Sequence, residues 1–95
     1  EKPINDRRIH LHIYGRVQGV GYRQSAQSQA TMLGVRGWVR NLPDGSVELV
    51  AEGADVAIKD FLSWCHHGPS FAKVIAVELS DKEPVGESQG FQIVY

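Results

Sequence analysis

The sequence predicts an α+β fold, in which two helices cover one face of a mainly antiparallel sheet. Three kinds of pattern support this prediction. Several short segments alternate apolar with polar residues, which is typical of strands with one buried face. Two longer segments repeat apolar residues at intervals of three or four, as on one face of a helix. Glycine and proline separate these segments and indicate turns between them.

The first predicted element is a strand over residues 8–14, where apolar and polar residues alternate strictly. Its apolar positions, which share one face, are Ile9, Leu11 and Ile13. A glycine-rich segment follows, and then a helix begins at Tyr22. The apolar residues of this helix share one face and are Tyr22, Ala26, Ala30 and Leu33. Gly34 stands where glycine commonly ends a helix.

A β-hairpin is predicted next, from strands over residues 35–41 and 46–52. The residues between these strands are Leu42, Pro43, Asp44 and Gly45. Proline presets the first turn position and glycine adopts the left-handed one, so this order favours a tight turn. The residues expected to face inward from the second strand are Val47, Leu49 and Ala51.

A second helix over residues 54–67 and two further strands complete the predicted fold. The helix has a buried stripe formed by Ile58, Phe61, Leu62 and Cys65, and it ends at Gly68 and Pro69. A strand over residues 73–79, a polar loop over 83–90 and a short strand over 91–95 follow. This order, βαββαβ with a fifth strand, predicts a ferredoxin-like two-layer sandwich. We expect an N-terminal tail over residues 1–7 and a single domain over residues 8–95.

The composition is that of an ordinary globular domain, but its charge is unevenly distributed. No apolar run approaches the roughly 18 residues of a membrane span. A single cysteine rules out an internal disulfide and favours a cytoplasmic location. Residues 7–43 carry six arginines and no acidic residue, whereas nine acidic residues and three lysines follow from Asp44 onward. An arginine-rich stretch suits a small anion or the phosphates of a nucleic acid.

The segment between the first strand and the first helix has the composition of an anion-binding loop. Its glycines are Gly15, Gly19 and Gly21. A loop placed there can direct consecutive backbone N–H groups at an anion bound at the helix N-terminus. Arg23 falls in the first helical turn, where an unpaired cation opposes the helix dipole by about 0.3–1 kcal/mol. A bound phosphate would reverse that cost. The simpler interpretation is a glycine-rich turn followed by a surface arginine.

Two motifs in the chain resemble signatures of the acylphosphatases, which are small hydrolases of carboxyl-phosphate bonds. The first signature, G-R-V-Q-G-V-x-F/Y-R, matches residues 15–23, with Gly21 at the variable position. The second matches Gly37-Trp38-Val39-Arg40-Asn41 followed by Pro43-Asp44-Gly45. Smaller agreements occur at Ala51-Glu52-Gly53, Gly68-Pro69 and Phe91-Gln92-Ile93. The resemblance spans residues 8–95 and implies the same fold that the periodicity predicts.

The resemblance also implies a role for individual residues. Arg23 would bind the substrate phosphate, Asn41 would hold the attacking water, and backbone amides would form a cradle. The implied phosphate-binding residues are Gly15, Arg16, Val17, Gln18, Gly19, Val20, Gly21, Tyr22 and Arg23. The products would be a carboxylate and inorganic phosphate.

The chemistry of these residues agrees with that reaction. Phosphoryl transfer needs charge stabilisation and in-line positioning of the reactants. A carboxylate, whose conjugate acid has a pKa of about 4, can leave without a proton donor, so a site without Asp, Glu or Cys can be sufficient. No G-K-S/T sequence follows the glycines, which disfavours a nucleotide-binding P-loop. We expect a monomer that acts on a small acyl phosphate without a metal or cofactor.

Two other groups of residues suggest different chemistry. His10 and His12 share a strand face, but no third metal ligand lies close in sequence. Cys65 adjoins His66 and His67, but it falls on the apolar stripe of its helix. Core packing is therefore the favoured interpretation of this cysteine.

Two alternative functions follow from other features. Trp38, flanked by Arg36 and Arg40 on the open side of the sheet, resembles a platform for single-stranded nucleic acid; the acidic C-terminal half argues against it. The other alternative is a non-catalytic anion-binding or carbamoyl-phosphate-processing module, as at the front of large hydrogenase-maturation proteins. The end of the chain at Tyr95 favours a free-standing enzyme. We expect neither a nucleic acid nor a membrane as partner.

Overall fold

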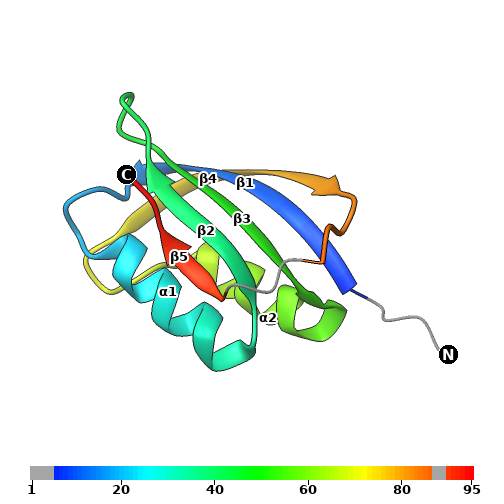
Figure 1. Cartoon of the computed structure of the whole chain (residues 1–95). Coiled ribbons are helices and arrows are strands. Elements are labelled where there is room, and N and C mark those ends of the chain that lie inside the picture. The colour runs from blue at the N-terminus through cyan, green and yellow to red at the C-terminus, as the bar shows by residue number, and fades with distance from the viewer. Residues whose placement is uncertain (1–5, 87–89) are drawn as a thin grey trace, which may run out of the picture.

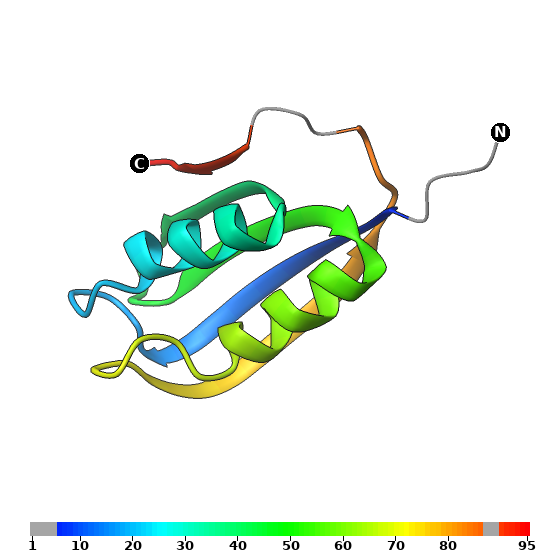
Figure 2. The ribbon, with the colours of Figure 1, turned by 90° about the horizontal axis from the view of Figure 1, so that it is seen from below.

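The computed structural model describes residues 6–86 and 90–95. The strands are β1 (Asp6–Arg16), β2 (Arg36–Asn41), β3 (Val47–Ala54), β4 (Lys73–Lys82) and β5 (Phe91–Ile93), and the helices are α1 (Tyr22–Leu33) and α2 (Asp55–Cys65). The strands form one sheet in the order β4-β1-β3-β2-β5, antiparallel except for the parallel pair β2 and β5. Both helices lie on one face of the sheet (Figures 1 and 2). The predicted two-layer sandwich is confirmed.

Several elements differ in length from their predicted ranges, because tertiary pairing determines where they end. β1 begins at Asp6, since this residue pairs with Ala54 of β3. The last two residues of the predicted tail therefore belong to the sheet, and residues 1–5 lie outside the described residues. β4 continues to Lys82, which pairs with Arg8 of β1.

The second helix and the last strand are shorter than predicted. α2 ends at Cys65, because the next residues form a turn in which the His67 N–H donates to the Trp64 carbonyl at 2.9 Å. β5 comprises Phe91–Ile93 and lies at the edge of the sheet, where β2 is its one neighbouring strand among the described residues. A short edge strand has one neighbour to order it, which explains why its pairing ends early.

The core lies between the helices and the sheet, and the predicted apolar faces supply it. The residues with no more than 1% exposure include Ile9, Leu11, Ile13, Tyr22, Ala26, Ala30, Ile58, Phe61 and Cys65. Leu33 and Leu62 are partly buried and pack against this cluster. Burial raises the pKa of the Cys65 thiol to about 12. This thiol is therefore protonated and unreactive at neutral pH, as its core position predicts.

The opposite face of the sheet carries polar side chains, of which Glu52 is fully buried. Its carboxylate accepts a hydrogen bond from Arg8 at 2.9 Å and two from the backbone N–H groups of Val85 and Gly86, at 3.1 and 2.8 Å. These two residues begin the connection from β4 to β5, within the predicted loop 83–90. Residues 87–89 of that loop lie outside the described part of the chain. Glu52 thus fastens the start of this connection to the sheet.

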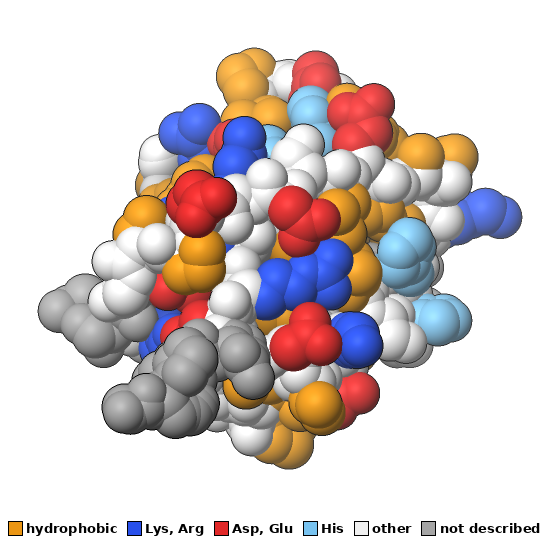
Figure 3. Space-filling model, turned by 90° about the vertical axis from the view of Figure 1, so that its right-hand side faces the viewer, with side chains coloured by type: hydrophobic (Ala, Val, Ile, Leu, Met, Phe, Trp, Pro, Cys, Tyr) orange, Lys and Arg blue, Asp and Glu red, His pale blue; other side chains and the backbone are white. Residues whose placement is uncertain are grey.

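The end of the molecule where β1 begins carries charges of both signs (Figure 3). Arg7 lies 3.0 Å from Asp81 and 3.8 Å from Asp55, and Lys59 lies 3.2 Å from Asp55. Acidic residues of the C-terminal half thus neutralise this part of the arginine-rich stretch. In the described residues, neither helix is long and apolar enough to cross a membrane.

Candidate active site

The loop between β1 and α1 brings its backbone to the N-terminus of the helix. Gly19 and Gly21 have φ values of 75° and 81°, and Gly21 is the N-cap of α1. Only glycine adopts this left-handed region at little cost, which explains its place in the motif. A Cβ at either position would meet nothing within 4 Å. These glycines are therefore required for the curvature of the loop and leave the space in front of it open.

A cavity of about 290 Å³ lies in front of this loop. Its lining residues are Val17, Gln18, Gly19, Gly21, Tyr22, Arg23, Gln24 and Asn41. The structure thus brings together the two residues implied to be catalytic, which come from α1 and from the end of β2. Three residues of the implied cradle do not line the cavity. Gly15 and Arg16 belong to β1, and Val20 packs against the core.

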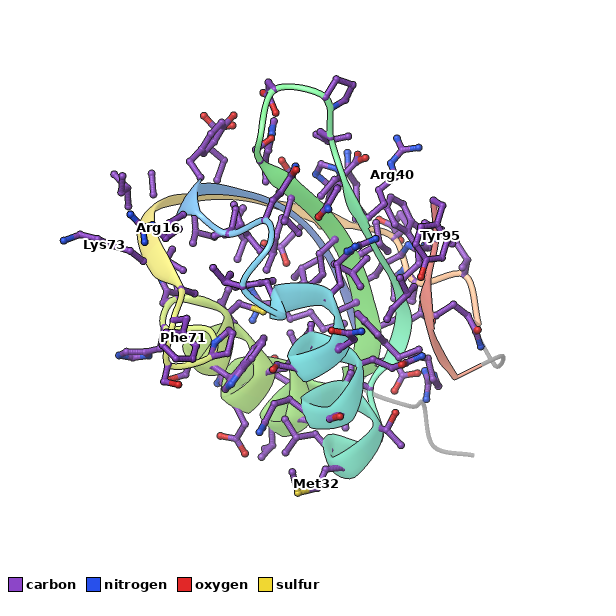
Figure 4. The ribbon with its side chains drawn as sticks, turned by 90° about the vertical axis from the view of Figure 1, so that its left-hand side faces the viewer. Arg16, Met32, Arg40, Phe71, Lys73 and Tyr95 are labelled. Carbon is purple, nitrogen blue, oxygen red and sulfur yellow. The ribbon has the colours of Figure 1, made fainter. Side chains whose placement is uncertain are left out.

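Ion pairs neutralise most of the arginine-rich stretch. Of the six arginines between residues 7 and 43, those that form ion pairs with carboxylates are Arg7, Arg8, Arg36 and Arg40. Within the described ranges, Arg16 and Arg23 have no ion pair. Figure 4 shows Arg16 beside Lys73 at one edge of the sheet. Of these two arginines only Arg23 lines the cavity, among the described residues, and a single cation there suits a small anion better than a long polyanion.

Asn41 lines the cavity and carries a buried acceptor without a partner. Its Oδ1 is buried and accepts no hydrogen bond from the described residues. A buried polar atom without a partner costs about 1–3 kcal/mol, and native proteins retain few of them outside functional sites. An amide at the lining of the cavity with an acceptor to satisfy is suited to hold a small donor there, such as a water molecule.

The side chain of Gln18 connects the loop to the β2–β3 hairpin. Its Nε2 donates to the carbonyl oxygens of Leu42 and Ser46, both at 2.8 Å. Because Leu42 directly follows Asn41, this connection fixes the distance between the loop and the amide of Asn41. Asp44 stabilises the same turn, accepting from the backbone N–H of Ser46 at 2.9 Å. The motif implies a role for the backbone of Gln18; the role of its side chain depends on hairpin packing that the motif does not reveal.

Tyr22 also lines the cavity, and it joins α1 to the end of α2. Its hydroxyl donates to the Cys65 carbonyl at 2.7 Å, and burial raises its pKa far above the ordinary value. Its ring centroid lies 5.3 Å from that of Trp64. A Cβ on Gly68 would lie 2.8 Å from the ring. Tyr22 is therefore held rigidly and has no free hydroxyl for proton transfer.

Tyr95 is a neighbour of Arg23 that the sequence analysis missed. The guanidinium carbon of Arg23 lies 5.2 Å from the centroid of the Tyr95 ring, within the range of a cation–π contact. Tyr95 is 98% exposed as a residue, so the contact orients the arginine without burying it. Nothing in the sequence pattern points to this pair, because β5 brings the two residues together only in the folded chain.

The other candidate groups have structural partners. His10 Nε2 lies 2.7 Å from a carboxylate oxygen of Glu48, and His12 Nε2 lies 2.6 Å from the Ser46 hydroxyl. In the described ranges, no group of three or more His, Cys, Asp or Glu residues could hold a metal ion. Arg40 lies over Trp38 at 5.4 Å on the open face, as predicted, but also pairs with Glu48 at 2.7 Å.

A cavity at a helix N-terminus, lined by loop residues and an arginine, suits a small anion such as a phosphate group. A family model described as acylphosphatase matches residues 9–93. An acylphosphatase of Thermococcus kodakarensis is 53% identical over 92% of this chain and 94% of its own. One from Roseiflexus is 51% identical, over 93% of this chain and 95% of its own. The crystal structure of acylphosphatase from Bacillus subtilis superposes with a TM-score of 0.89 at 35% identity, covering 94% of this chain and 99% of that chain.

The chain belongs to the acylphosphatase family. This finding confirms the resemblance carried by its two motifs and the prediction that it is an enzyme of this class.

Proposed function

We propose that this acylphosphatase hydrolyses the carboxyl-phosphate bond of a small acyl phosphate by in-line attack of water. The phosphoryl group would sit in the 290 Å³ cavity, held by Arg23 and by loop amides. Water held by Asn41 would attack phosphorus. The observation that carries the proposal is the juxtaposition of an arginine without an ion pair and an orphaned amide oxygen in one cavity at a helix N-terminus.

Arg23 and the loop amides address the charge on the phosphoryl oxygens. The guanidinium offers a planar fork of N–H donors that matches two phosphate oxygens. The backbone N–H groups around Gly19 and Gly21 add donors whose positions are set by the left-handed turns. Donors fixed in this way stabilise developing charge without reorganising during the reaction. Of the implied cradle residues 15–22, we assign the direct contacts to those that line the cavity.

The reaction needs no acid from the protein. Water oxygen forms a bond to phosphorus, the bond from phosphorus to the acyl oxygen breaks, and the carboxylate leaves with the bonding electrons. The cavity lining includes no Asp, Glu, His or Cys. The carboxylate is a weak base with a conjugate-acid pKa of about 4 and departs unprotonated. A phosphate oxygen of the substrate would accept the proton of the water, since the Asn41 amide is not a base at neutral pH.

We further propose that the enzyme works as a monomer in the cytoplasm, without a metal or cofactor. A buried cysteine whose pKa is raised to about 12 is compatible with a reducing compartment. The pairing of four of the six arginines disfavours a broad nucleic-acid surface.

The test is release of phosphate from benzoyl phosphate in the presence of EDTA. Arg23→Ala should remove phosphate affinity and turnover together, because the main charged contact is lost. Asn41→Ala should keep inhibition by inorganic phosphate and lower kcat by about 100-fold or more, as loss of a positioning hydrogen bond does. Near-normal turnover by Asn41→Ala would contradict the water-holding role. A pH–rate profile that followed a side-chain pKa of the enzyme would contradict proton transfer to the substrate.

A further inference from the structure

A second hollow adjoins the phosphate cavity, on the side of α2. Its volume is about 390 Å³, and its lining residues are Gln24, Ser25, Ser28, Gln29, Trp64 and Pro69. Gln24 lines both hollows, so they meet at this residue. The two hollows are also connected through a ring contact. The Trp64 ring, which lines the second hollow, packs on the Tyr22 ring, which lines the phosphate cavity. We call this second hollow the α1–α2 groove.

The direction of an in-line reaction points to the α1–α2 groove. Attacking and leaving oxygens stand on opposite sides of phosphorus in such a displacement. In Figures 1 and 4, the loop before α1 lies between the β2–β3 hairpin on one side and the loop between α2 and β4, which carries Phe71, on the other. Asn41 comes from the hairpin side. A leaving group on the side of phosphorus opposite the water held by Asn41 is therefore directed toward the end of α2, where the groove lies.

The described residues that line the α1–α2 groove are uncharged. Two amides and two hydroxyls come from α1, and an indole and a proline ring face them from the other side. Neutral donors and acceptors beside a flat ring suit an uncharged acyl group with a planar or aromatic face. An acyl group that carries a further phosphate or carboxylate would find no cation in this lining. The volume lies near the lower end of the range for small-molecule sites, about 300–1,000 Å³.

We propose that the α1–α2 groove is the acyl subsite and that it favours acyl phosphates whose acyl group is uncharged and planar. This assignment rests on the proposed function, since it takes the leaving group to be the acyl carboxylate. The phosphate cavity holds the reacting phosphoryl group, and the groove holds the part of the substrate that distinguishes one acyl phosphate from another.

The test compares benzoyl phosphate with acetyl phosphate, whose acyl group is too small to reach far into the groove. Ser28→Trp places a bulky ring in the groove from an exposed position on α1. It should raise KM for benzoyl phosphate about ten-fold, the scale of a lost pocket contact, and leave KM for acetyl phosphate unchanged. Inhibition by inorganic phosphate should also be unchanged, because the phosphate cavity is untouched.

Thr31→Trp is the matched control, since Thr31 is exposed on the same helix and does not line the groove. It should leave both KM values as they are. The assignment is overturned if Ser28→Trp changes both substrates alike, changes neither, or behaves as Thr31→Trp does. Asn41→Ala, assayed in the same series, tests the proposed function separately. It should remove turnover of both substrates. Retained turnover would contradict the proposed function, whereas the effect of Ser28→Trp on the two KM values would still test the assignment of the groove.

Discussion

Arg23 and the Asn41 Oδ1 share a property at the scale of single residues. In the described part of the chain, the first has no ion pair and the second no hydrogen bond, yet they line one cavity. Among the described residues the Nε of Arg36 is the other buried side-chain polar atom without a hydrogen-bond partner, whereas the buried Glu52 carboxylate accepts hydrogen bonds from Arg8, Val85 and Gly86. Polar groups without partners at one cavity cost stability. Such a cost is usual at a binding site before its ligand is present.

Gly19→Ala is expected to show that the conformation of the loop determines phosphate binding, independently of the stability of the fold. An alanine there is strained by about 1 kcal/mol in the left-handed region, although it meets no atom within 4 Å. Relief of that strain would turn loop amides away from the phosphate, so inhibition by inorganic phosphate should weaken at least several-fold. The measurements are that inhibition constant and the free energy of unfolding in urea.

Gly34→Ala provides the comparison for this variant. Gly34 has the same φ of 75° and equally open surroundings, but it ends α1 on the far side from the cavity. Its substitution should cost a similar free energy of unfolding and leave phosphate inhibition intact. Equal losses of phosphate affinity in the two variants would show that strain, and not loop amides, accounts for the effect.

At the scale of elements, the position of Asn41 depends on two segments that Gln18 joins. Gln18→Glu keeps the size of the side chain but replaces the N–H donors with a carboxylate that faces the Leu42 and Ser46 carbonyls. The hairpin should then shift away from the loop. We expect kcat to fall about ten-fold or more, since small displacements of positioning groups have large effects on rate.

Gln27→Ala serves as a control for the Gln18 variant. Gln27 also donates one side-chain hydrogen bond to a carbonyl, that of Phe91 at 2.9 Å, but it faces β5 and not the hairpin. Its loss should change kcat much less than the loss at Gln18. A Gln18→Glu enzyme with normal kcat would contradict the positioning role.

Periodicity and turn chemistry predicted the elements well, because each signal is local. The alternation of Ile9 with its neighbours and the proline-glycine turn specify a strand and a hairpin without help from the rest of the chain. The motifs likewise indicated Arg23 and Asn41, which the fold places in one cavity. The Arg23–Tyr95 contact and the groove wall at Trp64 could not be predicted, since they depend on how β5 and α2 pack in three dimensions. The same reason explains the longer β1 and β4.

At the scale of the whole molecule, Glu52 fastens the connection that carries the chain from one edge of the sheet toward the other. Glu52→Gln replaces one carboxylate oxygen with an NH₂ group. This buried donor would then face groups that are themselves donors, namely Arg8 and the N–H groups of Val85 and Gly86. Breaking a buried charge pair costs about 3–5 kcal/mol, and we expect a loss of stability near that range. Urea unfolding measures this loss of free energy of unfolding. The kcat of the folded enzyme should stay unchanged.

Glu48→Gln is the matched substitution on the same strand. Glu48 pairs with Arg40 and with His10, whose side chains are 47% and 30% exposed, and such solvent-exposed pairs contribute about 0–1 kcal/mol each. A small effect at Glu48 beside a large one at Glu52 would support the anchoring role of the buried carboxylate. Similar small effects at both positions would show that the connection does not depend on it.

The central claim is that the loop before α1 and Arg23 together hold a phosphoryl group next to a water on Asn41. A crystal structure of the enzyme with inorganic phosphate tests this directly. The account predicts a phosphate in the cavity with its oxygens about 2.7–3.1 Å from loop amides and the Arg23 guanidinium, and a water bound to Asn41 Oδ1 on the side away from the α1–α2 groove. A phosphate bound elsewhere, or an Asn41 amide turned away from it, would contradict the account.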